Sequence, residues 1–218
     1  MKTDHEIIET LEGLYAAVVA DVLDSLGYRN QTLSSDIRAL TPSNQLCGRV
    51  FTGRAVSVSE CPAEPYKLEM AAVDLMKTGD VFVVDAGHNK SSGFWGELLT
   101  TACQYKGVRG VVMTACCRDM WALNQLDFPV FGIGYHPADS KGRADIVEIA
   151  QPIEMDGVNI DSGDFILVDQ DGAVVIPKDV VEETLRLALE KVSGENIVRD
   201  ELRAGLPISE VFEKYGIL

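Results

Sequence analysis

Two short groups of polar residues in the middle of the chain could do chemistry together. Gly96-Glu97 opens a segment with apolar residues at helical spacing, and Arg118-Asp119 follows a valine-rich run. An arginine can bind a carboxylate through two parallel hydrogen bonds, and an aspartate can hold a hard divalent cation that keeps several waters. The unpaired backbone N–H groups at a helix start, here residues 96–99, favour an anion. These residues predict an anion site and a metal site that are neighbours.

The elements that must position these groups form one strand-helix-strand unit. The apolar runs 81–84 and 108–113 are typical of buried strands, and the helical spacing between them ends at Gly107. A right-handed crossover makes the two strands parallel, so the chain leaves both of them at one edge of the sheet, where ligands bind in open α/β sheets. A loop at 88–93 and the helix start would follow the first strand, and Arg118-Asp119 would follow the second.

Alternative interpretations of these residues remain open from the sequence. An Arg-Asp pair is common as a surface ion pair or a helix start, so Arg118-Asp119 indicates a site only through its convergence with Gly96-Glu97. The five cysteines include no C-x-x-C spacing, which predicts neither a disulfide framework nor a zinc site. Cys116-Cys117 lies close to the proposed site, and we interpret it as a pair of buried, reduced thiols.

Composition limits the class of partner. The net charge of −15, from 19 basic and 34 acidic residues, argues against a nucleic-acid partner or an anionic membrane surface, because both require a basic surface. A small anionic substrate would need a locally positive pocket. The chain shows no signal peptide and no apolar run of membrane length, and we expect a cytoplasmic protein with one domain, 1–218.

The remaining pattern predicts an α/β fold with flanking helices and an antiparallel group of strands near the C-terminus. Helical spacing predicts one helix that is capped by Thr3 or Asp4 and ends at Gly27, a short helix at 67–76, and a long helix that is capped by Asp179. A further short helix is expected from Asp119 to about Gln125, and a last one from Ser209. Strands are expected at 50–58, 130–134, 158–160, 165–168 and 173–176.

A family resemblance joins these observations. The pattern Trp95-Gly96-Glu97-Leu98, an intervening helix, Gly107-x-x-Gly110, a valine-rich strand and Arg118-Asp119 resembles the signature of the regulator of ribonuclease activity A (RraA) family. This family includes metal-dependent class II 4-hydroxy-4-methyl-2-oxoglutarate / 4-carboxy-4-hydroxy-2-oxoadipate aldolases. The segment Asp164 to Leu218 is also similar, so the resemblance covers most of the chain. It implies a layered, swivelling-type β/β/α domain that assembles into homotrimers or homohexamers with sites between subunits.

The resemblance also implies a role for each candidate residue. The arginine that matches Arg118 holds the carboxylate of pyruvate, and the aspartate that matches Asp119 ligates Mg²⁺ or Mn²⁺. The acidic residue that matches Glu97 binds water on the metal, and a glutamate from the C-terminal helix of a neighbouring subunit, best matched by Glu195, completes this water shell. The substrate-binding backbone amides match Gly96, Glu97, Leu98 and Leu99.

The implied activity is the cleavage of a 4-hydroxy-2-oxo acid to pyruvate and a second carbonyl compound. Oxaloacetate decarboxylation passes through the same enolate, so one site could perform both reactions. Two departures leave the substrate open: Ala122 stands where the aldolase branch often has an acidic residue, and Ala115 where it usually has glycine. The alternative is a regulator that binds and inhibits ribonuclease E, as the founding members do; Asp119 beside Arg118 favours the lyase.

Overall fold

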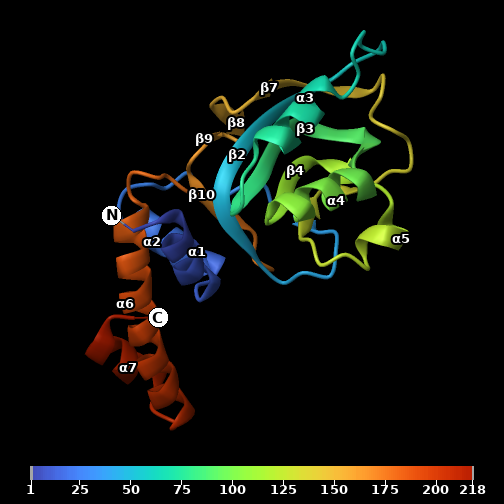
Figure 1. Cartoon of the computed structure of the whole chain (residues 1–218). Coiled ribbons are helices and arrows are strands. Elements are labelled where there is room, and N and C mark those ends of the chain that lie inside the picture. The colour runs from blue at the N-terminus through green and yellow to red at the C-terminus, as the bar shows by residue number, and fades with distance from the viewer. Residues whose placement is uncertain (1, 218) are drawn as a thin grey trace.

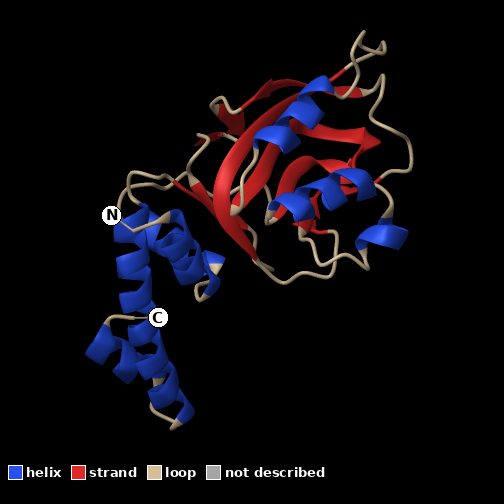
Figure 2. Cartoon of the chain, in the orientation of Figure 1, coloured by secondary structure: helices blue, strands red, loops and turns tan. Residues whose placement is uncertain are grey.

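A curled mixed sheet occupies the centre of the computed structural model, which describes residues 2–217 (Figures 1 and 2). Within these residues the main sheet has nine strands, in the order β1-β5-β4-β3-β2-β10-β11, with β6 paired to β4 and β7 paired to β2. A second, two-stranded sheet is formed by β8 and β9. The strands are β1 (Arg38–Ala39), β2 (Leu46–Ser57), β3 (Asp80–Trp95), β4 (Gly110–Cys117), β5 (Val130–Gly132), β6 (Gly134–Tyr135), β7 (Ala144–Ile149), β8 (Ile153–Met155), β9 (Val158–Ile160), β10 (Phe165–Val168) and β11 (Ala173–Ile176).

The predicted strand-helix-strand unit is confirmed as β3, α4 (Glu97–Lys106) and β4. The two strands are parallel, with Val81 opposite Gly110, and Gly107 ends α4 in the left-handed conformation, at φ 75°. The prediction of a loop at 88–93 is wrong. These residues belong to β3, which continues as a bulged strand and pairs again with β4 at Asn89 and Gly93. At these register shifts β3 has more residues than the facing part of β4, and the extra residues form bulges. The polar sequence alone does not reveal these bulges.

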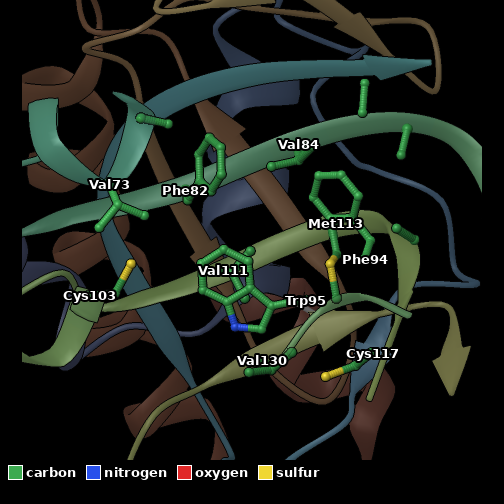
Figure 3. Close-up of a cluster of buried hydrophobic side chains, with 14 of the residues drawn as sticks. Val73, Phe82, Val84, Phe94, Trp95, Cys103, Val111, Met113, Cys117 and Val130 are labelled. Atoms are coloured by element: carbon green, nitrogen blue, oxygen red, sulfur yellow. The ribbon is translucent and has the colours of Figure 1, made fainter. Parts of the chain in front are cut away.

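Alternate residues of β3 face two separate parts of the core. Phe82 and Val84 belong to a cluster with Trp95 and Met113, beneath α3 (Lys67–Leu75) and α4 (Figure 3). Val81 and Val83 point to the other face and pack in a cluster with β8 and β9. Burial on both faces explains the continuous apolar run of this strand. The expected layering of β/β/α type is confirmed.

A third cluster lies under a separate group of helices at the other end of the molecule. Side chains of α1 (Asp4–Glu12), α2 (Ala16–Ser25) and α6 (Val181–Arg203) pack there against β2, β10 and β11. Figure 1 shows α6 and α7 (Ile208–Tyr215) extending away from the sheet and from α4. None of the helices within residues 2–217 combines the length and apolar character needed to cross a membrane.

Two helix predictions need correction. The expected single helix up to Gly27 is two helices: Thr3 caps α1 as predicted, but Gly13 ends it, and Tyr15 is extended before α2 begins. The first turn of α2 is stabilised from far along the chain, because the Ala16 N–H donates to Asp169 Oδ2 at 2.7 Å. The long helix α6 follows Val180 rather than Asp179 and has no side-chain cap.

The other expectations for these elements hold with small shifts of boundary. The helix after Asp119 is α5 (Met120–Leu123), shorter than expected, and β10 and β11 are antiparallel as predicted. Met1 and Leu218, the ends of the predicted domain 1–218, lie outside the described residues.

Candidate active site

A pocket of about 390 Å³ lies at the edge of the sheet where β3 and β4 end. It brings together five of the residues predicted from the sequence, namely Gly96, Leu98, Leu99, Arg118 and Asp119. Its wall also contains residues that the sequence analysis did not single out as site residues: Tyr66, Glu69, Met70, Gly93, Phe94, Asp139 and Ser140.

Backbone contacts fix the two predicted groups against each other. The Arg118 N–H donates to Trp95 O at 2.8 Å, which ties the end of β4 to the end of β3. Asp119 then adopts the left-handed conformation, at φ 61°, and precedes α5. This turn directs its carboxylate to the start of α4, where Asp119 Oδ2 accepts a hydrogen bond from the Glu97 N–H at 3.2 Å. The carboxylate is therefore held by the N-terminus of a helix, where negative charge is stabilised.

Two glycines permit this close approach. A Cβ atom added at Gly96 would lie 2.5 Å from Asp119 Oδ2, and one added at Gly93 would lie 2.7 Å from Arg118 Cβ. The Gly93 position would also meet His136 O at 2.3 Å. Any larger residue at either position would displace the arginine or the aspartate, which gives the Trp-Gly-Glu pattern a steric reason.

The Arg118 guanidinium lies among carboxylates. Its Nη2 is 3.3 Å from Asp139 Oδ1, and its Nε is 3.8 Å from Asp119 Oδ2. Asp139 also accepts a hydrogen bond from the Tyr66 hydroxyl. Burial opposes ionisation of Asp139, but the Tyr66 hydroxyl and Arg118 outweigh it and lower its pKa. Burial, followed by the Asp139 carboxylate, raises the pKa of Tyr66 to about 12, so its proton stays on the phenol.

Glu69 is the functional candidate that the sequence analysis missed. Its side chain is only 6% exposed and lies in the pocket wall on α3. Burial raises its pKa to about 7, the nearby Asp145 and Asp139 add to the increase, and Arg118 partly offsets it. A signal was present: Glu69 stands three and four residues before Ala72 and Val73, which places it on the buried face of α3.

Two predicted catalytic residues lie outside the pocket wall of their own chain. The Glu97 side chain turns along α4 and accepts a hydrogen bond from Thr101 Oγ1 at 3.1 Å. Glu195 lies on α6, where it accepts a hydrogen bond from the Tyr15 hydroxyl and forms a 3.9 Å ion pair with Arg199. A contribution of Glu195 to the site of a neighbouring copy stays a prediction.

The donor atoms near Asp119 fit a hard cation rather than zinc. Within residues 2–217, no group of three or more histidine, cysteine or acidic side chains is arranged to hold a metal. The Asp119 side chain is 36% exposed, so one oxygen-donor carboxylate is presented to solvent, which is the arrangement that Mg²⁺ and Mn²⁺ accept with water ligands. The neighbouring Cys117 is buried, as predicted, and burial raises its pKa to about 12.

Comparison with known proteins places the chain in a family. A family model described as RraA-like: Aldolase/RraA matches residues 16–175. The chain belongs to the RraA-like family. The resemblance of the Trp95 to Asp119 pattern is therefore confirmed, and both halves of the pocket edge lie within the region that the RraA-like model covers.

Individual relatives differ in how they are named. The "Putative 4-hydroxy-4-methyl-2-oxoglutarate aldolase" of Halalkalibacterium halodurans is 32% identical over 173 residues, which are 79% of this chain and 77% of that protein. RraAS2 of Streptomyces coelicolor, whose structure is titled that of an unusual member of the RNase ES inhibitor RraA protein family, is 27% identical. It superposes with a TM-score of 0.82 over 92% of this chain and 100% of RraAS2. Protein DlpA of Legionella pneumophila is 24% identical over 96% of the chain, but the chain spans only 34% of DlpA.

Proposed function

We propose that this RraA-like protein is a lyase that depends on Mg²⁺ or Mn²⁺ and cleaves a 4-hydroxy-2-oxo acid to pyruvate and a second carbonyl compound. Oxaloacetate decarboxylation is proposed as a second reaction of the same site. The observation that carries the proposal is the hydrogen bond between Asp119 and the first amide of α4, in a pocket that the Arg118 guanidinium also enters. The relatives that are named as aldolases support the reaction class.

Arg118 is the proposed binding group for the substrate carboxylate. Its two carboxylate neighbours, Asp139 and Asp119, hold the guanidinium at the pocket wall, with Arg118 36% exposed. A planar guanidinium can donate two parallel hydrogen bonds to the substrate carboxylate while it keeps one ion pair. The amides of Leu98 and Leu99 lie in the first turn of α4, where no helix carbonyl precedes them, so they add donors for the same anion.

Asp119 is the proposed metal ligand. A divalent cation held by Asp119 would supply positive charge to stabilise the enolate when the C3–C4 bond breaks. The Glu97 backbone N–H contacts Asp119, and the Glu97 carboxylate lies one turn along α4 with Thr101. We assign this carboxylate the positioning of a water molecule that accepts the proton of the C4 hydroxyl. Glu195 of a neighbouring copy would complete this water shell in a homotrimer or homohexamer.

A protein regulator that binds ribonuclease E is the second candidate. The likeness to RraAS2 along nearly the whole chain favours it, and so do two exposed apolar residues, Leu98 in the pocket wall and Trp121 on α5, at 79% and 75%. A regulator does not need the contact between Asp119 and the start of α4, and this contact is why we place the lyase first.

A pyruvate-release assay tests the choice. Oxaloacetate and several 4-hydroxy-2-oxo acids would be supplied with Mg²⁺, with Mn²⁺ and with EDTA. Asp119→Ala should abolish release without unfolding the protein, whereas Asp127→Ala, a control at an exposed aspartate, should not change it. Full turnover in EDTA, or an active Asp119→Ala variant, would contradict the metal-dependent mechanism. Inhibition of ribonuclease E by a protein without lyase activity would support the regulator.

A further inference from the structure

The pocket wall contains a carboxyl group that none of the roles above uses. Glu69 is 6% exposed and packs on α3 beside Ala72 and Val73, two members of the apolar core cluster. No side chain or backbone group among residues 2–217 forms a hydrogen bond or an ion pair with its carboxylate. The Glu69 oxygens are not among the fully enclosed side-chain atoms that lack a partner, and Glu69 lines a cavity large enough for a small oxo acid.

The charges around Glu69 come from three parts of the chain. Asp145 on β7 and Asp139 in the segment before it oppose ionisation, and Arg118 after β4 favours it. Tyr66, one turn earlier, remains a neutral phenol because its pKa is about 12. The two aspartates and burial together outweigh the arginine and keep the pKa of Glu69 at about 7. At neutral pH a large fraction of Glu69 therefore carries a proton.

The proposed reaction requires a proton that the assigned residues do not supply. Breaking the C3–C4 bond leaves its electron pair in the enolate of pyruvate, and C3 must then gain a proton. Arg118 does not release one at neutral pH. Asp139 is ionised because its pKa is lowered, and the Tyr66 proton is held in a hydrogen bond to Asp139. Among the described residues that line the pocket, Glu69 is the acid with a transferable proton near pH 7.

We propose that Glu69 is a further catalytic residue, the general acid that protonates C3 of the enolate. The inference rests on the proposed function. The Glu69 carboxyl proton passes to C3, the electron pair of the enolate double bond forms the new C–H bond, and the enolate oxygen becomes the C2 carbonyl. Glu69 is left as a carboxylate and regains a proton from solvent through the pocket. In the reverse direction, the Glu69 carboxylate removes a proton from the methyl group of pyruvate.

The reverse step gives a test that needs no carbon–carbon cleavage. The protein with Mg²⁺ would be incubated with pyruvate in D₂O, and loss of the methyl proton signal would be followed by NMR. Glu69→Gln keeps the size of the side chain but cannot accept a proton, and it should slow the exchange by about 10²–10⁴-fold. Exchange by the unmodified protein should rise with pH through about 7, the pKa of Glu69, because this direction uses the carboxylate. Glu64→Gln, at an exposed glutamate just before α3, is the matched control and should exchange normally.

A second measurement detects the proton itself. The infrared band of a protonated carboxyl group should be present in the unmodified protein near neutral pH, absent from Glu69→Gln, and lost as the pH rises through about 7. This readout does not depend on turnover. It shows whether the proton is present, and the exchange assay then separates a proton donor from a buried group that only supports the pocket wall.

The outcomes distinguish failure of this inference from failure of the proposed function. Cleavage of substrates by the unmodified protein, together with undiminished exchange by Glu69→Gln, would overturn the role of Glu69 and leave the lyase intact. Exchange that depends on Glu69 without cleavage of any substrate tested would support the proton donor and remove the carbon–carbon lyase. A protein that neither cleaves nor exchanges would overturn both.

Discussion

Replacing Glu69 by glutamine should change how the stability of the protein depends on pH. The pKa of Glu69 is raised from 4.5 to about 7 in the folded chain, so the folded state binds its proton more tightly than the unfolded state. The contribution of Glu69 ionisation to the free energy of unfolding is therefore most favourable below pH 4.5. It falls as the pH rises from 4.5 to about 7 and stays constant above that. Glutamine removes this dependence, because it does not ionise.

The size of the effect follows from the shift. A difference of one in pKa between the folded and unfolded states corresponds to about 1.4 kcal/mol of free energy of unfolding. The part of the Glu69 shift that takes effect between pH 5 and pH 8 therefore corresponds to about 2–3 kcal/mol. Urea titrations with EDTA present would give the free energy of unfolding of both proteins at each pH. The value for Glu69→Gln minus the value for the unmodified protein should increase by this amount from pH 5 to pH 8. Glu64→Gln should track the unmodified protein. A Glu69→Gln difference that is flat with pH would mean that Glu69 ionises in the folded chain as it does in water, and the reasoning from its burial would be wrong.

Further predictions concern the other residues of the proposed site. Arg118→Lys should raise the inhibition constant of oxalate by about tenfold to hundredfold, because lysine loses the bidentate contact, whereas Glu97→Gln should leave it nearly unchanged and slow turnover by about 10²–10⁴-fold. Unchanged inhibition and turnover in both variants would show that this pocket is not the active site. Gly96→Ala should weaken Mg²⁺ binding in calorimetric titrations, because its Cβ would lie 2.5 Å from Asp119 Oδ2; normal affinity would show that the aspartate can move without cost. If Glu195 serves a neighbouring copy, assembly is required for turnover, and light scattering that shows a fully active monomer would exclude this.

The central unit could be predicted from the sequence because its signals are local. The apolar run at 81–84 needs burial on both faces, Gly107 marks the end of a helix, and parallel strands bring Gly96 and Arg118 to one edge. The bulged continuation of β3 through 88–93 could not be predicted in this way, because its polar residues become strand only by pairing with β4.

The missed parts of the site depend on contacts between distant segments. Asp139 reaches Arg118 from the chain before β7, and its partner Tyr66 stands just before α3. Glu69 had a local signal in the buried stripe of α3, but its meaning depends on which charges the fold places around it. The break between α1 and α2 also depends on a distant contact, because Asp169 accepts a hydrogen bond from the first residue of α2.

The position of β2 has a consequence for how the chain folds as it is made. One side of β2 pairs with β3, which follows soon after, but its other side waits for later segments: Ala55 pairs with Ile146, and Arg49 pairs with Phe165. Such distant pairings make folding slow, and an unpaired strand edge can join a second chain. A ribosome-bound chain that has reached only α5 therefore has the proposed site groups that follow β3 and β4 but an open β2 edge. Fragments that end there should aggregate, and adding the segment from β7 to β11 should restore solubility.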